Sequence, residues 1–147
     1  MESQFSGFNY LLVSLSRQIR SMVKTEMNDT ELTFEQIRAI SYIDRFKGCS
    51  QKQLADLLEM KPMSTTKIVS FLDGKGYVER KVDPSDKRAF KLYLTPTGKA
   101  QTKDIKKISK RVFSLISKGL SDAEIEGFYN LMKKIEDNIV NVRTQKD

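Results

Sequence analysis

Residues 50–73, SQKQLADLLEMKPMSTTKIVSFLD, contain two short amphipathic segments separated by a break at residues 59–62. Pro62 suits the first position of the second segment, because an amide hydrogen there has no partner within a helix. The inward-facing residues expected at helical spacing are Leu54, Ala55, Leu57 and Leu58, and then Thr65, Ile68, Val69 and Leu72. The spacing predicts a helix-turn-helix.

The outer face of the second helix is expected to be small, hydroxylated and basic. Its predicted residues are Ser64, Lys67, Ser70 and Phe71. The sequence leaves open whether the Phe71 ring is exposed or packs against the wing. Hydroxyl and ammonium groups can donate hydrogen bonds to base edges and phosphates. Lys61 precedes the helix, where a cation opposes the helix dipole and a phosphate would turn that liability into a contact. A solvated lysine is the alternative.

Two alternating segments follow, residues 77–82 and 90–94, around the turn-forming DPSDKRA. They predict a β-hairpin with a charged tip. Lys87 and Arg88 are candidates for insertion into a minor groove or for contacts along phosphates. We expect Asp83 and Asp86 to hold the arginine's guanidinium by bidentate pairing. An ordinary solvated hairpin is the alternative.

Three helix starts share one pattern, a hydroxyl cap followed three residues later by Gln or Glu. The caps are Thr33, Ser50 and Ser121, which predict helices from about residues 34, 51 and 122. Thr95-Pro96 is expected to cap and open a further long helix. Cys49 takes the apolar position before one cap, so we favour packing there over a redox switch.

Apolar residues follow a 3, 4 spacing near both ends of the chain, which predicts long helices with narrow packing seams. The seams are Phe5, Phe8, Leu12, Leu15, Ile19 and Met22, then Ile105, Ile108, Val112 and Leu115, and finally Ile125, Phe128, Met132, Ile135, Ile139 and Val142. We expect them to pack across the two-fold axis of a homodimer. A monomeric bundle is the alternative.

The composition favours a polyanionic partner. The 147 residues include 26 Lys and Arg against 19 Asp and Glu, a net charge of +7. Residues 47–99 hold eleven of the basic and six of the acidic residues, a net +5, which favours double-stranded DNA over a membrane. The chain has no histidine. This counts against imidazole-based catalysis and most zinc sites, so we expect no catalytic residues, no metal and no cofactor.

No stretch of the sequence is long and apolar enough for a membrane span. The amino terminus carries an acidic residue where a signal peptide carries positive charge, so a cytoplasmic location is expected.

The chain resembles the MarR family of bacterial transcriptional regulators from Phe5 to about Val142. The resemblance is carried by SQKQLADLLEM and by STTKIVSFLDGKGYVERKVDPSDKRAFKLYLTPTGKA. It implies a mainly α fold with a small β-hairpin wing, in which a winged helix-turn-helix is flanked by amino- and carboxyl-terminal dimerisation helices. The expected organisation is one domain over 1–147, with dimerisation helices at 5–26 and 97–145, a DNA-binding lobe at 33–95, a helix-turn-helix at 50–73 and a wing at 77–94.

The resemblance further implies a homodimeric repressor of a pseudo-palindromic operator, with half-sites roughly 34 to 36 Å apart. By position, Ser64, Thr66 and Lys67 fall where the family reads the major groove, and Arg88 falls on the wing. The full candidate DNA-binding set is Lys61, Ser64, Thr66, Lys67, Ser70, Lys87 and Arg88. Many relatives have arginine at the position of Lys67, where lysine offers a point charge.

Family members often respond to small aromatic acids. The candidate effector pocket here is Tyr10, Arg17, Tyr42 and Arg45, with an ordinary helix surface as the alternative. A winged-helix module that docks a protein, without sequence-specific DNA binding, is the second functional hypothesis. A broad apolar outer face on the second helix would favour it.

Overall fold

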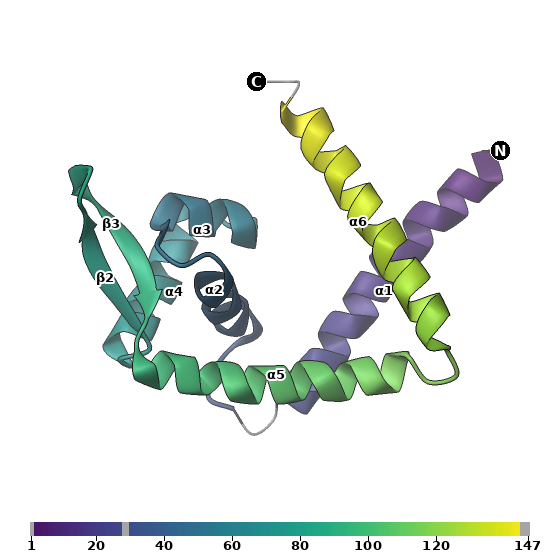
Figure 1. Ribbon diagram of the computed structural model, residues 1–147, viewed down its shortest axis with the longest axis horizontal. Coiled ribbons are helices and arrows are strands. Elements are labelled where there is room, and N and C mark those ends of the chain that lie inside the picture. Colours follow the sequence, from purple (N-terminus) through teal and green to yellow (C-terminus); the bar gives the residue numbers. More distant parts are fainter. Residues whose placement is uncertain (1, 28–29, 145–147) are drawn as a thin grey trace. The chain divides into compact units, whose positions relative to one another are not determined.

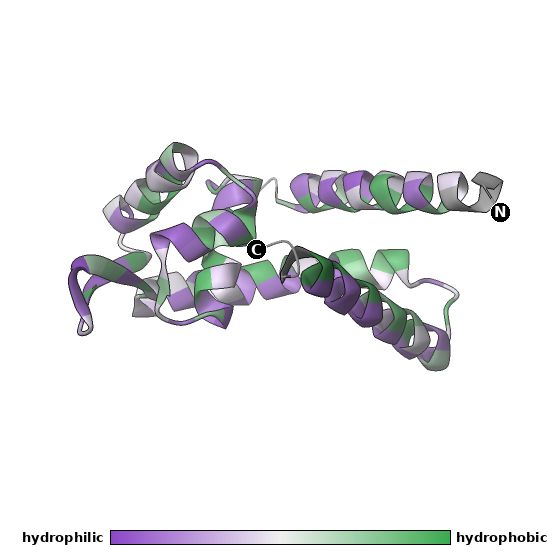
Figure 2. Cartoon of the chain, turned by 90° about the horizontal axis from the view of Figure 1, so that it is seen from above, coloured by the Kyte–Doolittle hydropathy of each residue, from purple (hydrophilic) through white to green (hydrophobic). Residues whose placement is uncertain are grey.

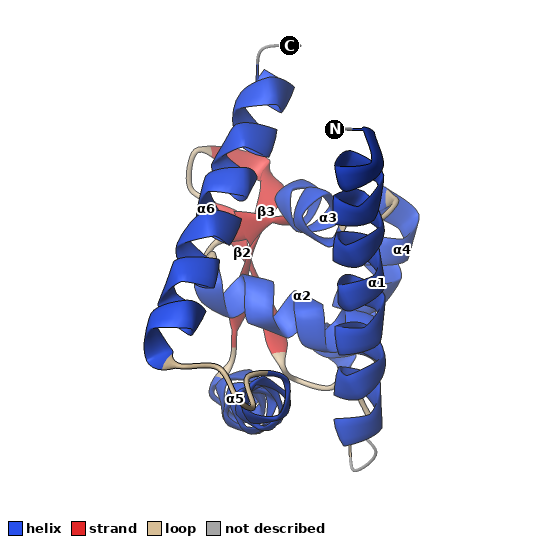
Figure 3. Ribbon diagram, turned by 90° about the vertical axis from the view of Figure 1, so that its right-hand side faces the viewer, coloured by secondary structure: helices blue, strands red, loops and turns tan. Residues whose placement is uncertain are grey.

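Helices make up most of the chain. The computed structural model describes residues 2–27 and 30–144, with side chains over 6–27 and 30–142. The elements are α1 Glu2–Glu26, α2 Phe34–Arg45, β1 Cys49–Ser50, α3 Gln51–Leu58, α4 Pro62–Gly74, β2 Val78–Asp83, β3 Asp86–Leu94, α5 Pro96–Ile116 and α6 Asp122–Thr144 (Figure 1). Strands form a small part of the fold, as Figure 3 shows. The expected mainly α fold with a hairpin wing is confirmed.

The helix starts follow the caps in the sequence. The Thr33 hydroxyl accepts from the Gln36 amide nitrogen at 3.3 Å, and the Gln36 side chain accepts in return from the Thr33 backbone at 2.8 Å. Ser50 and Gln53 make the same reciprocal pair at the start of α3. Ser121 and Glu124 do so before α6. The starts predicted near 34, 51 and 122 are therefore confirmed.

Two compact units divide the chain, Met1–Val112 and Phe113–Asp147. The first unit contains the hydrophobic core. Its fully buried side chains include Ile40, Ile43, Leu54, Leu58, Val69, Leu72, Val78 and Leu92. They come from α2, α3, α4 and the sheet, so the two short helices of the helix-turn-helix are held by one shared core.

The sheet has three antiparallel strands in the order β1-β3-β2. Cys49 pairs with Leu92, and Val78 pairs with Leu94, which places the root of the hairpin against the core. The register shifts at Val82/Asp83, just before the tip. The hairpin thus projects from the same core that holds α3 and α4.

The wing leads directly into α5. The Thr95 hydroxyl accepts from the Gly98 amide at 3.0 Å and donates to the Gly76 carbonyl at 2.6 Å, so the predicted Thr95 cap is confirmed. A side chain at Gly98 would collide with the Tyr77 carbonyl. This glycine therefore lets α5 approach the base of the wing closely.

Apolar residues, green in Figure 2, recur along α1 and along α6, each helix considered by itself. On α1, Phe8, Leu12, Leu15 and Ile19 are exposed. On α6, Phe128, Met132, Ile139 and Val142 are exposed. These residues belong to the predicted seams. The Phe5 side chain of that prediction lies outside the described residues.

Candidate nucleic-acid interface

Helix α4 presents one face to the core and the opposite face to solvent. Thr65, Ile68, Val69 and Leu72 are buried, which is the inner stripe predicted from the spacing. Thr65 is wholly buried, and its hydroxyl donates to the Lys61 carbonyl at 3.3 Å. This hydrogen bond satisfies the Thr65 hydroxyl, the polar group of the buried stripe.

The start of α4 is open. Lys61 occupies the N-cap position, and its side chain makes no capping hydrogen bond. Pro62 at the first helical position has no amide hydrogen to satisfy. The next amides of an uncapped first turn suit an anion such as a DNA phosphate, which also interacts favourably with the helix dipole.

The outer face of α4 is mostly polar. Thr66, Lys67 and Ser70 are exposed, and Ser64 is half-buried. Phe71, whose ring the sequence left open between solvent and packing against the wing, is partly buried against the core. The structure describes the whole of α4. Within this helix, Met63 is the one large apolar side chain that lies mainly in solvent, with 76% of its surface exposed. Its thioether is suited to contact a thymine methyl group.

A hydrogen bond joins α3 to this outer face. The Gln51 side-chain amide donates to the Thr66 hydroxyl at 2.6 Å, and that hydroxyl donates to the Pro62 carbonyl at 2.9 Å. Sequence reasoning missed Gln51, because its partner lies 15 residues away on another helix. Its position directly after the Ser50 cap was the one available signal.

A second network connects α4 to the wing. The Arg80 guanidinium donates to the Ser70 hydroxyl at 3.3 Å and pairs with Asp73 at 3.3 Å. Arg80 was also missed, since strand alternation reveals nothing about which helix a strand faces. Ser70 therefore carries a cationic neighbour on the surface predicted to meet DNA.

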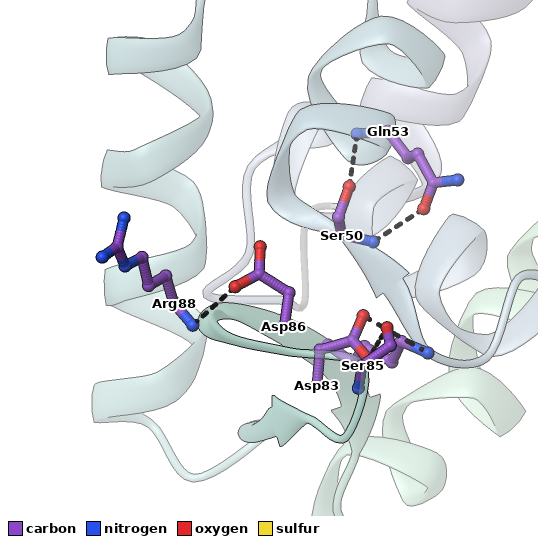
Figure 4. A network of polar contacts seen from close by, with 7 residues as sticks. Ser50, Gln53, Asp83, Ser85, Asp86 and Arg88 are labelled. Carbon is purple, nitrogen blue, oxygen red and sulfur yellow. Dashed lines mark hydrogen bonds and ion pairs between the residues drawn. The ribbon is translucent and has the colours of Figure 1, made fainter.

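The wing tip is built by its two acidic residues, but not in the way expected. Asp83 accepts from the Ser85 backbone amide at 2.9 Å and from the Ser85 hydroxyl at 2.7 Å. Asp86 accepts from the backbone amide of Arg88 at 2.9 Å. Figure 4 shows the Arg88 guanidinium pointing away from both carboxylates.

The predicted bidentate pairing of Asp83 and Asp86 with the Arg88 guanidinium is thus wrong. Short side chains in a tight turn satisfy nearby backbone donors first, because little chain entropy is lost in doing so. The ion-pair partner of Asp83 is instead Lys91, at 3.5 Å. The backbone and hydroxyl bonds from Ser85, with the Lys91 charge, hold the pKa of Asp83 below its usual value.

The cations of this lobe divide into paired and unpaired ones. Lys75 pairs with Glu31, Lys81 with Glu79, and Lys91 with Asp83. Within the part of the chain that the structure describes, no ion pair is formed by Lys61, Lys67, Lys87 or Arg88. The cations on the start and outer face of α4 and on the wing tip are therefore free to meet an external anion.

Contacts from Arg38 of α2 hold the carboxyl end of α3 in place. The Arg38 guanidinium donates to the Leu57 and Leu58 carbonyls at 3.5 and 3.4 Å. It also lies 5.8 Å from the Tyr42 ring centre and 6.0 Å from that of Phe34. These contacts satisfy the carboxyl end of α3 and tie it to the core.

Cys49 is buried beside β3, and desolvation raises the pKa of its thiol. A protonated, buried thiol is a poor nucleophile, so the structure favours packing over a redox role.

The candidate effector residues lie in different settings. Arg17 lines an open depression of about 410 Å³ on α1, together with Leu12, Val13, Ser16 and Arg20. Tyr10 is 74% exposed. Tyr42 packs against the core, and Arg45 stacks over Phe46 at 5.6 Å. Of the four, Arg17 is thus the one that lines this depression.

Two absences hold for the described residues 2–27 and 30–144. No group of three or more acidic, cysteine or histidine residues is placed to hold a metal ion. None of the helices is long and apolar enough to cross a membrane.

We compared the sequence and the fold with those of known proteins. A model of the MarR family matches residues 30–89. The HTH-type transcriptional regulator BilQ of Clostridioides difficile (strain CD3) is 26% identical over 134 residues, which cover 91% of this chain and 90% of the relative. A crystal structure of MarR superposes with a TM-score of 0.83 at 23% identity, covering 93% of both chains. The structure of BpsR from Bordetella bronchiseptica, whose DNA binding is regulated by 6-hydroxynicotinic acid, superposes with a TM-score of 0.75 at 18% identity, covering 88% of this chain and 98% of that one.

The helix pair, the three-stranded sheet and its wing define a winged helix-turn-helix protein. The chain is similar to the MarR family over residues 30–89, and the full-length relative it matches is a transcriptional regulator. The resemblance inferred from the sequence is confirmed.

Proposed function

We propose that the chain is a homodimeric, sequence-specific repressor that binds a pseudo-palindromic operator in double-stranded DNA. The observation that carries this proposal is the unpaired basic surface formed by Lys61, Lys67, Lys87 and Arg88. Thr66 and Lys67 are both exposed on α4, and among the described residues none of these four cations forms an ion pair. Hydroxyls and cations on one exposed helix face suit the major groove, and cations on a wing suit phosphates or the minor groove. Such a protein would act in the cytoplasm, on the chromosome.

The exposed apolar seams on α1 and α6 support a dimer. Large apolar side chains are costly to leave in water, and monomers rarely carry long apolar stripes on two helices. A second copy of the chain is the natural cover, because two symmetric reading helices match a two-fold related DNA site. Light scattering of the purified protein tests this, and a monomeric mass at micromolar concentration contradicts it.

Lys67→Ala tests the reading surface. We expect it to weaken binding to the operator and to reduce discrimination against random DNA, by about 1 to 3 kcal/mol. Arg88→Ala should lose affinity more evenly across sequences. A footprint on DNA flanking the protein's own gene supplies the operator, and a reporter placed behind that site should be silenced by the protein. If both variants bind the operator like the parent at about 0.15 M salt, the assigned surface is wrong.

The docking hypothesis predicts a broad apolar outer face on α4. In α4, which the structure describes completely, Met63 is the one large apolar side chain that is mainly exposed. The other exposed residues on that face are polar. DNA binding that falls steeply with salt favours the nucleic-acid role, because phosphate contacts release counterions.

We further propose that a small aromatic acid releases the DNA. The depression on α1 combines two guanidinium groups, Arg17 and Arg20, with apolar side chains. That combination suits an aromatic ring bearing a carboxylate. Addition of salicylate or 6-hydroxynicotinate should raise the melting temperature and lower DNA affinity, and Arg17→Ala should abolish both effects. No change in either quantity contradicts the proposal.

A further inference from the structure

The hydrogen bond between Gln51 and Thr66 connects the two helices of the helix-turn-helix on their exposed side. Gln51 is the first residue of α3, and Thr66 lies on the outer face of α4. Their side chains meet at 2.6 Å, and the Thr66 hydroxyl also lies 2.9 Å from the Pro62 carbonyl. An amide side chain from α3 is thus placed beside the outer face of α4.

This chain of bonds determines which way the Gln51 amide faces. A hydroxyl has one hydrogen, and a carbonyl oxygen can only accept. The Thr66 hydrogen therefore goes to Pro62, and the Thr66 oxygen accepts from Gln51. Only the amide nitrogen of Gln51 can supply that hydrogen, so its Oε1 and its second N–H stay available to another partner.

The available groups indicate the chemistry of that partner. Phosphate oxygens only accept hydrogen bonds, so they offer nothing to the Gln51 Oε1. The exocyclic amino groups of adenine and cytosine do donate in the major groove, and adenine adds an N7 acceptor beside its amino group. A side-chain amide that presents both an acceptor and a donor matches the adenine edge.

We propose that Gln51 is a specificity-determining residue that reads an adenine in each operator half-site, and that Thr66 is a positioning residue that orients its amide. The inference rests on the proposed DNA-binding function. It also changes the role that the resemblance implied for Thr66: its hydroxyl hydrogen is committed to Pro62, so it cannot donate to a base.

The arrangement is pre-organised. A glutamine side chain has several rotatable bonds, and ordering it on binding costs conformational entropy. The bond to Thr66 restricts those rotations before DNA arrives. Removing the Thr66 oxygen should therefore weaken the adenine preference without removing the residue that reads it.

The test is selection from a library of randomised double-stranded DNA by the full-length protein, followed by sequencing of the bound fraction. The wild-type protein should enrich adenine at one position per half-site. Gln51→Ala should lower that preference by roughly 5- to 150-fold while leaving the other positions unchanged. Gln51→Glu keeps an acceptor but loses the N–H, so the preference should move to cytosine at the same position.

Variants of Thr66 isolate the positioning role. Thr66→Val removes the hydroxyl and should reduce the adenine preference, whereas Thr66→Ser keeps the hydroxyl and should retain it. Gln18→Ala is the matched control, because Gln18 donates to Ser14 at 3.0 Å in the same kind of amide–hydroxyl pair on α1. It should leave every base preference unchanged.

The possible failures are distinguishable. If the wild-type protein enriches no sequence, the proposed function fails and this inference fails with it. If the wild-type protein enriches a site and Gln51→Ala enriches the same site with only a uniform loss of affinity, the inference alone is overturned. If Gln51→Ala loses the adenine but Thr66→Val does not, the positioning role of Thr66 is overturned.

Discussion

The salt dependence of DNA binding gives a quantitative test of the unpaired basic surface. The perturbation is Arg88→Ala, which removes one exposed wing cation from each subunit without removing a partner from any ion pair of the described residues. The Asp86 contact to residue 88 uses the backbone amide, so it survives the substitution. The wing should therefore keep its shape while it loses charge.

The magnitude follows from the number of cations. Lys61, Lys67, Lys87 and Arg88 give about eight phosphate contacts in a dimer, so log K should fall with log salt at a slope of about −7. That slope corresponds to a loss of about 10⁴-fold in affinity between 50 and 200 mM salt. Without Arg88 the slope should be about −5 and the loss about 10³-fold.

Fluorescence anisotropy of a labelled duplex, titrated at several salt concentrations, measures these slopes. Lys107→Ala is the control, because Lys107 pairs with Asp104 at 3.0 Å on α5 and is not part of the unpaired basic surface. Its slope should equal that of the parent. A parent slope shallower than about −3, or an Arg88→Ala slope that matches the parent, would refute the reasoning.

Three further predictions concern stability and reactivity. Leu72→Ala removes a fully buried core side chain and should lower the free energy of unfolding by about 2 to 5 kcal/mol, as measured by urea titration; a loss below about 1 kcal/mol would contradict this packing. Because the pKa of Asp83 is lowered in the folded state, its contribution is present above the unfolded pKa and is lost as pH falls through the folded value. The melting-temperature difference between the parent and Asp83→Asn should therefore be constant near neutrality and shrink below about pH 4, whereas a difference independent of pH would exclude this linkage. The buried Cys49 thiol should react slowly with a disulfide reagent at pH 7 in the native protein and quickly in urea, and equal rates in both would show that it is accessible.

Local patterns in the sequence predicted most of the secondary structure. The caps at Thr33, Ser50 and Ser121 identified where helices begin, because a capping box involves residues only three positions apart. The inner stripe of α4 was also predictable, since helical spacing alone decides which residues share a face. Lys67 was found from helical spacing and Arg88 from its place near the tip of the predicted hairpin, and their DNA contacts stay a prediction.

Errors arose where two partners compete for one side chain. Asp83 and Asp86 were expected to pair with a guanidinium, but nearby backbone and hydroxyl donors are their partners, joined in the case of Asp83 by Lys91. Helical spacing left the environment of the Phe71 ring open, and the ring packs at the edge of the core with the Lys75 ammonium 5.8 Å from its centre. Such outcomes depend on the distances within a folded turn or at a helix edge, which spacing along the chain does not specify.

The sequence by itself determined the helix-turn-helix, the wing and the concentration of positive charge between residues 47 and 99, because caps, periodicity and charge are local properties. Only the tertiary structure decided which cations remain unpaired and which side chains from separate elements meet. Gln51 reaches Thr66, and Arg80 reaches Ser70, because a shared core sets α3 and the wing against α4. Contacts between elements depend on how those elements pack, and packing is a property of the whole folded lobe.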